Sequence, residues 1–144
     1  MSGKEIMPFA GQRIVCLALV FGMTMYAIVA GVLLQTNNGV GLVEEPIEEL
    51  NLVSVILGAA VAISAIGTRL AITKRAEALP KSERALPRLL SRIAPIAILE
   101  AGCLFAITAW MLNGQAVPAL AVACVLLSIA IAMIPMHDPD AESH

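Results

Sequence analysis

The sequence lacks the residue patterns on which common enzyme active sites are built. Its two histidines, His137 and His144, both lie close to the C-terminus, and no HExxH motif or phosphate-binding loop occurs. No nucleophile–base pair can be recognised. We therefore expect a protein that is not an enzyme and that needs no cofactor.

Cysteine is scarce, and its three residues form no motif. Cys16, Cys103 and Cys124 fall in apolar stretches without CxxC spacing, which indicates inert structural thiols. The polar tail from residue 135 to 144 contains histidines and acids, but no predicted element would hold them around a metal ion. The sequence therefore predicts no metal site.

Charge is sparse, since 14% of the residues are charged and 59% are hydrophobic. One core of a soluble domain could not bury so much apolar surface, so lipid is the expected solvent. Four apolar runs approach the roughly 20 residues that span a bilayer. They cover residues 14–34, 52–70, 93–112 and 117–134. We expect an all-α, polytopic membrane protein with four transmembrane helices in an up-and-down bundle.

Basic residues are absent from two of the three connections between these runs. All nine lie in the lead 1–13, at the end of the second run, or in the loop 71–92. Because cytoplasmic segments retain Lys and Arg, the lead, this loop and the tail 135–144 are expected in the cytoplasm. The chain is predicted to cross a bacterial inner membrane several times. The lipid bilayer is an expected partner, and nucleic acid is not.

The basic loop indicates contact with anionic lipid. If residues 82–92 are helical, Arg84, Arg88 and Arg92 share one face at a spacing of four. Such a segment is expected to lie on anionic headgroups, with docking of a cytoplasmic partner as the alternative. The predicted headgroup contacts are Arg69, Lys74, Arg75, Lys81, Arg84, Arg88 and Arg92.

In contrast to the basic loop, the connection 35–51 is acidic. It carries Glu44, Glu45, Glu48 and Glu49 around Pro46. Acids and a proline suit the start of a helix, because they complement its positive end. A solvated helix start is the simpler interpretation, and an outer docking patch for a partner or a cation is the alternative.

Small residues recur every four positions in the first two runs. Ala27 and Gly31 form one such pair in the first run. The second run has two adjacent small-residue faces, which consist of Ser54, Gly58 and Ala62 and of Ala60, Ser64 and Thr68. Such faces gain contact from another helix and not from lipid tails. The second run is therefore expected to pack tightly within the chain or against another subunit.

An acid, Glu100, lies inside the third run. It is seven residues past Ile93 and so about 10 Å into the hydrocarbon, where a charge costs several kcal/mol. Counting from the inner ends of the runs puts Ser64 and Ser128 in the same layer, with Thr68 close to Ser64. We expect these four residues to form a buried polar layer, in which a protonated Glu100 shares hydrogen bonds with the hydroxyls.

Two functions are compatible with this acid. In the first, the chain is a structural or accessory subunit that packs against other membrane subunits or against copies of itself. In the second, Glu100 carries a proton or a cation, because intramembrane acids often mark such paths. The first is the preferred interpretation, since one acid without a relay is little support for transport.

Two stretches resemble known families. AILEAGCLFAITAWMLNG, with Ile134-Pro135 after the fourth run, resembles uncharacterised small four-helix bacterial membrane proteins, which implies a fold and no activity. LGAAVAISAIGT, a basic loop and a helix with Pro95 and Glu100 are similar to the hairpin of the proton-carrying ring subunit of rotary ATP synthases. The second resemblance implies a proton on Glu100, although that subunit has two spans where four are expected here.

Overall fold

The structure, a computed structural model, describes residues 8–135, and four α-helices make up most of this range. They are α1 (Phe9–Thr36), α2 (Glu48–Ala78), α3 (Ala85–Asn113) and α4 (Ala119–Met133), with a short 3-10 helix η1 (Lys81–Glu83) before α3. The predicted all-α, four-helix fold is confirmed. The first seven residues and the tail from residue 136, including its histidines and acids, lie outside the described residues.

Three helices are long and apolar enough to cross a membrane. They are α1, α2 and α3, with 28, 31 and 29 residues. By contrast, α4 has 15 residues, which corresponds to about 22 Å, and it is shorter than the predicted span 117–134. It starts after the turn at Val117 and Pro118 and ends at Met133, because helical geometry is disfavoured for the residue before a proline and Ile134, which precedes Pro135, is extended.

Both flanking helices extend into the expected loop 71–92. α2 continues to Ala78 and α3 starts at Ala85, so only a short link joins them. Arg84 closes the end of α2 by donating from Nε to the Leu79 carbonyl at 2.6 Å and from Nη2 to the Glu77 carbonyl at 2.9 Å. These bonds satisfy carbonyls that a helix end leaves free. Arg84 therefore precedes α3 and shares no helix face with Arg88 and Arg92.

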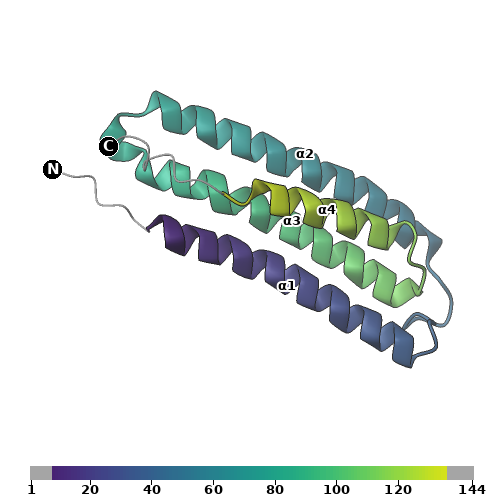
Figure 1. Cartoon of the computed structure of the whole chain (residues 1–144). Coiled ribbons are helices and arrows are strands. Elements are labelled where there is room, and N and C mark those ends of the chain that lie inside the picture. Colours follow the sequence, from purple (N-terminus) through teal and green to yellow (C-terminus); the bar gives the residue numbers. More distant parts are fainter. Residues whose placement is uncertain (1–7, 136–144) are drawn as a thin grey trace.

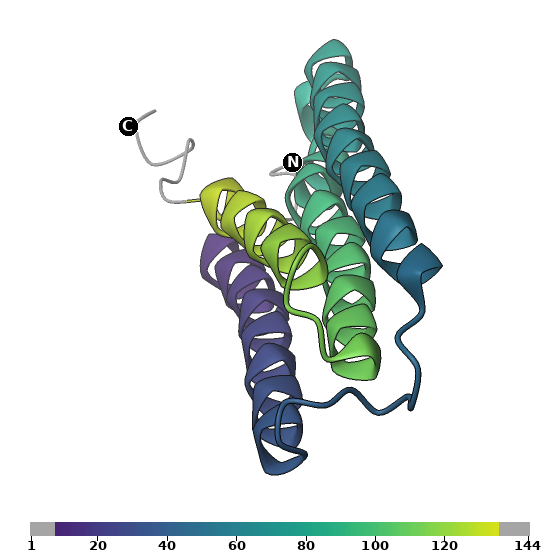
Figure 2. The same cartoon turned by 90° about the vertical axis from the view of Figure 1, so that its right-hand side faces the viewer.

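The central helix is α3. α1 and α3 run in one direction and α2 and α4 in the other (Figure 1). Each of the other three helices packs on α3, whereas α1 and α2 form no packed interface with each other in the described part of the chain. Figure 2 shows α4 lying across one face of the layer formed by α1, α3 and α2. The arrangement is therefore a three-helix layer covered on one side.

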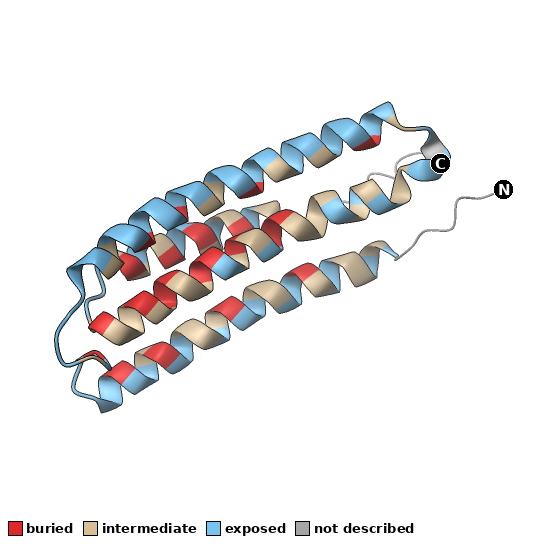
Figure 3. Ribbon diagram, turned by 180° about the vertical axis from the view of Figure 1, so that it is seen from behind, coloured by how far each residue is buried: buried red, intermediate tan, exposed pale blue. Residues whose placement is uncertain are grey.

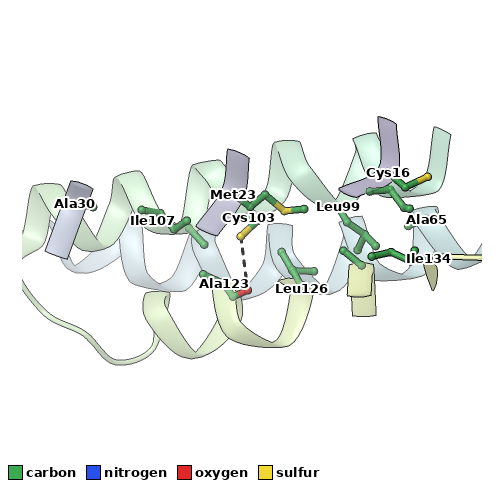
Figure 4. Packing of buried hydrophobic residues seen from close by; sticks show 13 residues of the cluster. Cys16, Met23, Ala30, Ala65, Leu99, Cys103, Ile107, Ala123, Leu126 and Ile134 are labelled. Atoms are coloured by element: carbon green, nitrogen blue, oxygen red, sulfur yellow. Dashed lines mark hydrogen bonds between the residues drawn. The ribbon is translucent and has the colours of Figure 1, made fainter. Parts of the chain in front are cut away.

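The buried residues lie where α4 meets this layer (Figure 4). All four helices contribute, for example through Met23, Ala65, Leu99 and Leu126. The Cys103 thiol points at the Ala123 carbonyl at 3.6 Å, which ties α3 to α4. Many of the core residues are alanines or cysteines, so the core depends on close helix approach more than on large side chains.

Two glycines permit this close approach. A Cβ at Gly102 would lie 2.7 Å from Cγ1 of Val61, and a Cβ at Gly58 would lie 2.3 Å from Cγ1 of Val122. Both distances are far below the 3.5–4.0 Å of ordinary carbon contacts. The face of Ser54, Gly58 and Ala62 is thus used inside the chain, since Ser54 and Gly58 are buried and Ala62 is half-buried.

The connection between α1 and α2 is fastened to the end of α3. The amides of Leu42 and Val43 donate to the carbonyls of Met111 and Leu112, each at 3.2 Å. A Cβ at Gly41 would lie 2.0 Å from the Leu112 carbonyl oxygen, and Gly114 adopts a φ of 70° against the Gly41 amide. Backbone therefore lies directly on backbone at this outer end, which we define as the end where α1 stops.

Gly41→Ala is expected to destabilise the fold by about 1–3 kcal/mol, because the new methyl group meets a backbone carbonyl that cannot rotate away. The measurement is thermal unfolding in detergent, followed by helical circular dichroism. Gly67→Ala is the matched control, since no neighbouring part of the described chain lies within 4 Å of its Cβ position and alanine favours a helix. Equal melting temperatures for the two variants would contradict this packing.

Candidate functional site

Glu100 lies on the side of α3 that faces α1. Its Oε1 is 3.6 Å from the position of a Cβ on Gly22, so the carboxylate lies against the α1 backbone. Within residues 8–135 it accepts no hydrogen bond. Because every buried side-chain oxygen or nitrogen in that range has a partner, the carboxylate must reach the surface of the chain.

A hydrogen-bonded pair lies on the outer side of Glu100. The hydroxyls of Tyr26 and Thr108 are 2.9 Å apart. Thr108 donates its only hydroxyl proton to the Leu104 carbonyl at 2.8 Å, so Tyr26 is the donor of the pair. Thr108 is eight residues beyond Glu100, or about 12 Å along the helix.

A second polar group lies on the inner side, towards the start of α1. Arg92 donates from Nη1 to Oε1 of Gln12, and its guanidinium lies 5.2 Å from the centre of the Phe9 ring. Arg92 is eight residues before Glu100, again about 12 Å along the helix. The α1–α3 interface thus carries polar groups at three levels, with the acid in the middle.

One face of α3 is left bare by the described residues. Cys103 marks the side that contacts α4, and Ala101 lies about 200° around the helix from it. Ala97 and Ala101 are both exposed, and Thr108 lies within about 20° of Ala101 in projection. Figure 3 views the layer from the side opposite α4, where α1, α3 and α2 lie uncovered. We call this side the open face.

The second helix borders the open face with Ser64. Gly58 contacts α4 and Val61 contacts α3, and Ser64 lies about 60° further around the helix from Val61, away from α4. Ser64 and Ala60 are exposed, and Thr68 is half-buried. The open face is therefore formed by Gly22 and Tyr26 of α1, Ala97, Glu100, Ala101 and Thr108 of α3, and Ala60 and Ser64 of α2.

The predicted layer of buried hydroxyls around Glu100 does not form within this chain. The inner end is the opposite end of the molecule, where α1 begins. Measured along the helices from the Val61–Gly102 contact, Glu100 lies about 3 Å and Ser64 about 4.5 Å nearer the inner end, so the two residues lie at similar depths. However, Ser64 is exposed on the α2 flank of the open face. Ser128 is exposed on α4, and its hydroxyl donates to the Cys124 carbonyl at 2.8 Å. Depth can be counted from sequence, but the direction of a side chain depends on which helices are neighbours.

Arg84 and Arg92, which were predicted to contact headgroups, form hydrogen bonds within the protein. Arg84 closes α2 and Arg92 contacts α1, as described above. The side chains of four others are exposed near the inner end, so their contact with lipid stays a prediction. These are Arg69, Lys74, Arg75 and Arg88. Lys81 lies in η1.

A cavity of about 120 Å³ opens between α2 and α3 among Thr73, Glu77, Arg84, Arg88 and Ser91.

Asn113 has a role that the sequence did not reveal. This buried residue accepts from the Ile47 amide at 3.0 Å and donates to the Ile47 carbonyl at 2.9 Å. It therefore holds the start of α2 on the end of α3. An asparagine before Gly114 signals the end of a helix, but nothing in the sequence indicates a partner 66 positions away.

No protein family, curated protein or solved structure matches the chain significantly. In the described residues, no three His, Cys, Asp or Glu side chains lie together as metal ligands would.

Tyr26→Phe is expected to lower stability by about 0.6 kcal/mol, the average for a hydrogen bond between membrane helices. Thr24→Val is a matched control, because the Thr24 hydroxyl bonds only to the Val20 carbonyl of its own helix. A double-mutant cycle with Thr108→Val, measured by unfolding in detergent, should show that the two substitutions are not additive. Full additivity would mean that the two hydroxyls do not interact.

Proposed function

We propose that this chain is a multi-pass protein of a bacterial inner membrane that acts as a structural or accessory subunit by packing its helices against another membrane segment. The first support is the exposure of large apolar side chains on the long helices. Phe21 of α1 is 65% exposed and Ile63 of α2 is 72% exposed. Large apolar side chains of this exposure on three helices of spanning length suit lipid as the solvent.

The distribution of charge supports the proposed orientation. Because α1 and α3 run opposite to α2, Arg13, Arg75 and Arg88 all lie towards the inner end. Glu44, Glu45, Glu48 and Glu49 lie at the outer end, where α2 starts. Basic residues are retained on the cytoplasmic side, so the inner end, where α1 begins and α4 ends, is assigned to the cytoplasm.

The observation that carries the proposal is a carboxylate that reaches the bare side of a spanning helix. Glu100 accepts no hydrogen bond in the described chain, and an acid facing acyl chains costs several kcal/mol. Another helix that covers the open face would remove Glu100 and Ser64 from lipid. The chain alone therefore leaves a surface that an assembly would complete.

Transport of a proton or a cation through Glu100 is the second candidate. It is favoured by the polar groups about 12 Å to either side of the acid, which Tyr26–Thr108 and Arg92–Gln12 provide along one interface. Intramembrane acids with polar neighbours at successive levels are typical of ion paths.

Glu100→Gln separates the two candidates. If Glu100 acts in packing, co-purification of the assembly in mild detergent is retained, because glutamine also forms hydrogen bonds, whereas Glu100→Ala lowers it. If Glu100 carries a proton, Glu100→Gln abolishes proton flux into vesicles while the assembly persists. Glu77 is an exposed acid near the inner end, so Glu77→Gln should change neither the co-purification nor the proton flux. Normal assembly of Glu100→Ala would contradict the packing role.

A further inference from the structure

We propose that the open face is covered by the open face of a second copy of this chain, in a parallel dimer whose twofold axis runs along the membrane normal in front of α3. This inference rests on the proposed function and names its partner. It follows from the way in which polar and small residues are distributed on the two sides of α3.

The first step is the symmetry of the layer. On the open face α3 lies in the middle, with α1 on one side and α2 on the other (Figure 3). Two copies inserted in the same orientation and related by this axis place α3 against α3 and α1 against the partner's α2. A twofold interface has to be complementary to itself, so the α1 side must match the α2 side at each depth.

The second step is the match of hydrogen-bonding groups. Glu100 lies at the border of α3 with α1, and Ser64 lies on the other flank, on α2. Their depths, counted from the Val61–Gly102 contact, differ by only about 1.5 Å. The twofold axis preserves depth and exchanges the flanks, so Glu100 of each copy faces Ser64 of the other. Both the acid that lacks a partner and the exposed hydroxyl are then satisfied, twice per dimer.

The third step is the shape of the central strip. Ala97 and Ala101 are exposed, four residues apart, and centred on the open face. A small-xxx-small spacing allows two helix backbones to approach closely. Gly22, which is exposed at the depth of Glu100, leaves room on α1 for the partner's second helix. A helix without a hydroxyl at that depth would leave Glu100 facing an apolar surface.

Disulfide trapping in native membranes tests the dimer. Cys124 is the one exposed native cysteine of the described residues, and it is first replaced by alanine. Ala101→Cys then places a thiol beside the axis. Val125→Cys is the matched control, because Val125 is 58% exposed on α4 and lies within about 1.5 Å of the same depth. Circular dichroism of the purified variants checks that both keep their helices.

Oxidation of Ala101→Cys is expected to give a disulfide-linked species of twice the chain mass. Its yield should be at least tenfold higher than the yield from Val125→Cys. Capture of a protein of different mass by Ala101→Cys would overturn the second copy as the occupant and would leave the proposed function standing. Equal and low trapping at the two positions would also overturn the second copy as the occupant, since a dimer about this axis brings the two thiols at position 101 together, whereas the proposed function is tested separately by the Glu100 variants.

Mixing of two variants tests the Glu100–Ser64 match itself. Homodimers of Glu100→Ala and homodimers of Ser64→Ala each lose both contacts, whereas a mixed dimer keeps one. Co-expression with two different affinity tags should therefore favour mixed dimers about threefold over random pairing, which corresponds to the average membrane hydrogen bond. Random pairing in a dimer that the thiol at position 101 traps would overturn the proposed register.

Discussion

The helices around α3 are held together by close contacts at small residues. Gly102 admits Val61, and Gly58 admits Val122, so α2 and α4 meet where larger residues would hold them apart. Membrane helices gain little from burying apolar side chains away from lipid, and their association relies on contact area and on hydrogen bonds. Small residues at these contacts fix α4 on one side of α3, and no other helix of residues 8–135 covers the opposite side.

The outer end is held together by backbone and by one amide. Gly41 lies on the last turn of α3, and Asn113 bonds both main-chain groups of Ile47. A connection that would otherwise be a free loop thus becomes part of the packed structure. The inner end is joined differently, by Arg84 on α2 and by Arg92 on α1. Arg84 and Arg92, two of the cationic side chains expected to face lipid, therefore connect helices.

The number and type of helices could be predicted from sequence, because apolar runs of about 20 residues without charge are typical of helices long enough to span a membrane. The depth of Glu100 and Ser64 could also be counted, since the rise per residue is constant. The direction of Ser128 could not, because it depends on which side of α3 carries α4. The helix α2 is longer than the apolar run for another reason: the run ends at Arg69 and Leu70, but Lys and Arg continue a helix as readily as apolar residues do.

The shortness of α4 has a consequence for the lipid around the protein. Its length of about 22 Å is some 8 Å less than the hydrocarbon core of a typical bilayer. In the membrane that we propose, acyl chains next to α4 would have to compress, while those next to α1 and α2 would not. Hydrophobic mismatch of this kind has an energy that depends on bilayer thickness. The protein would therefore deform the two sides of its lipid annulus unequally and would be sensitive to acyl chain length.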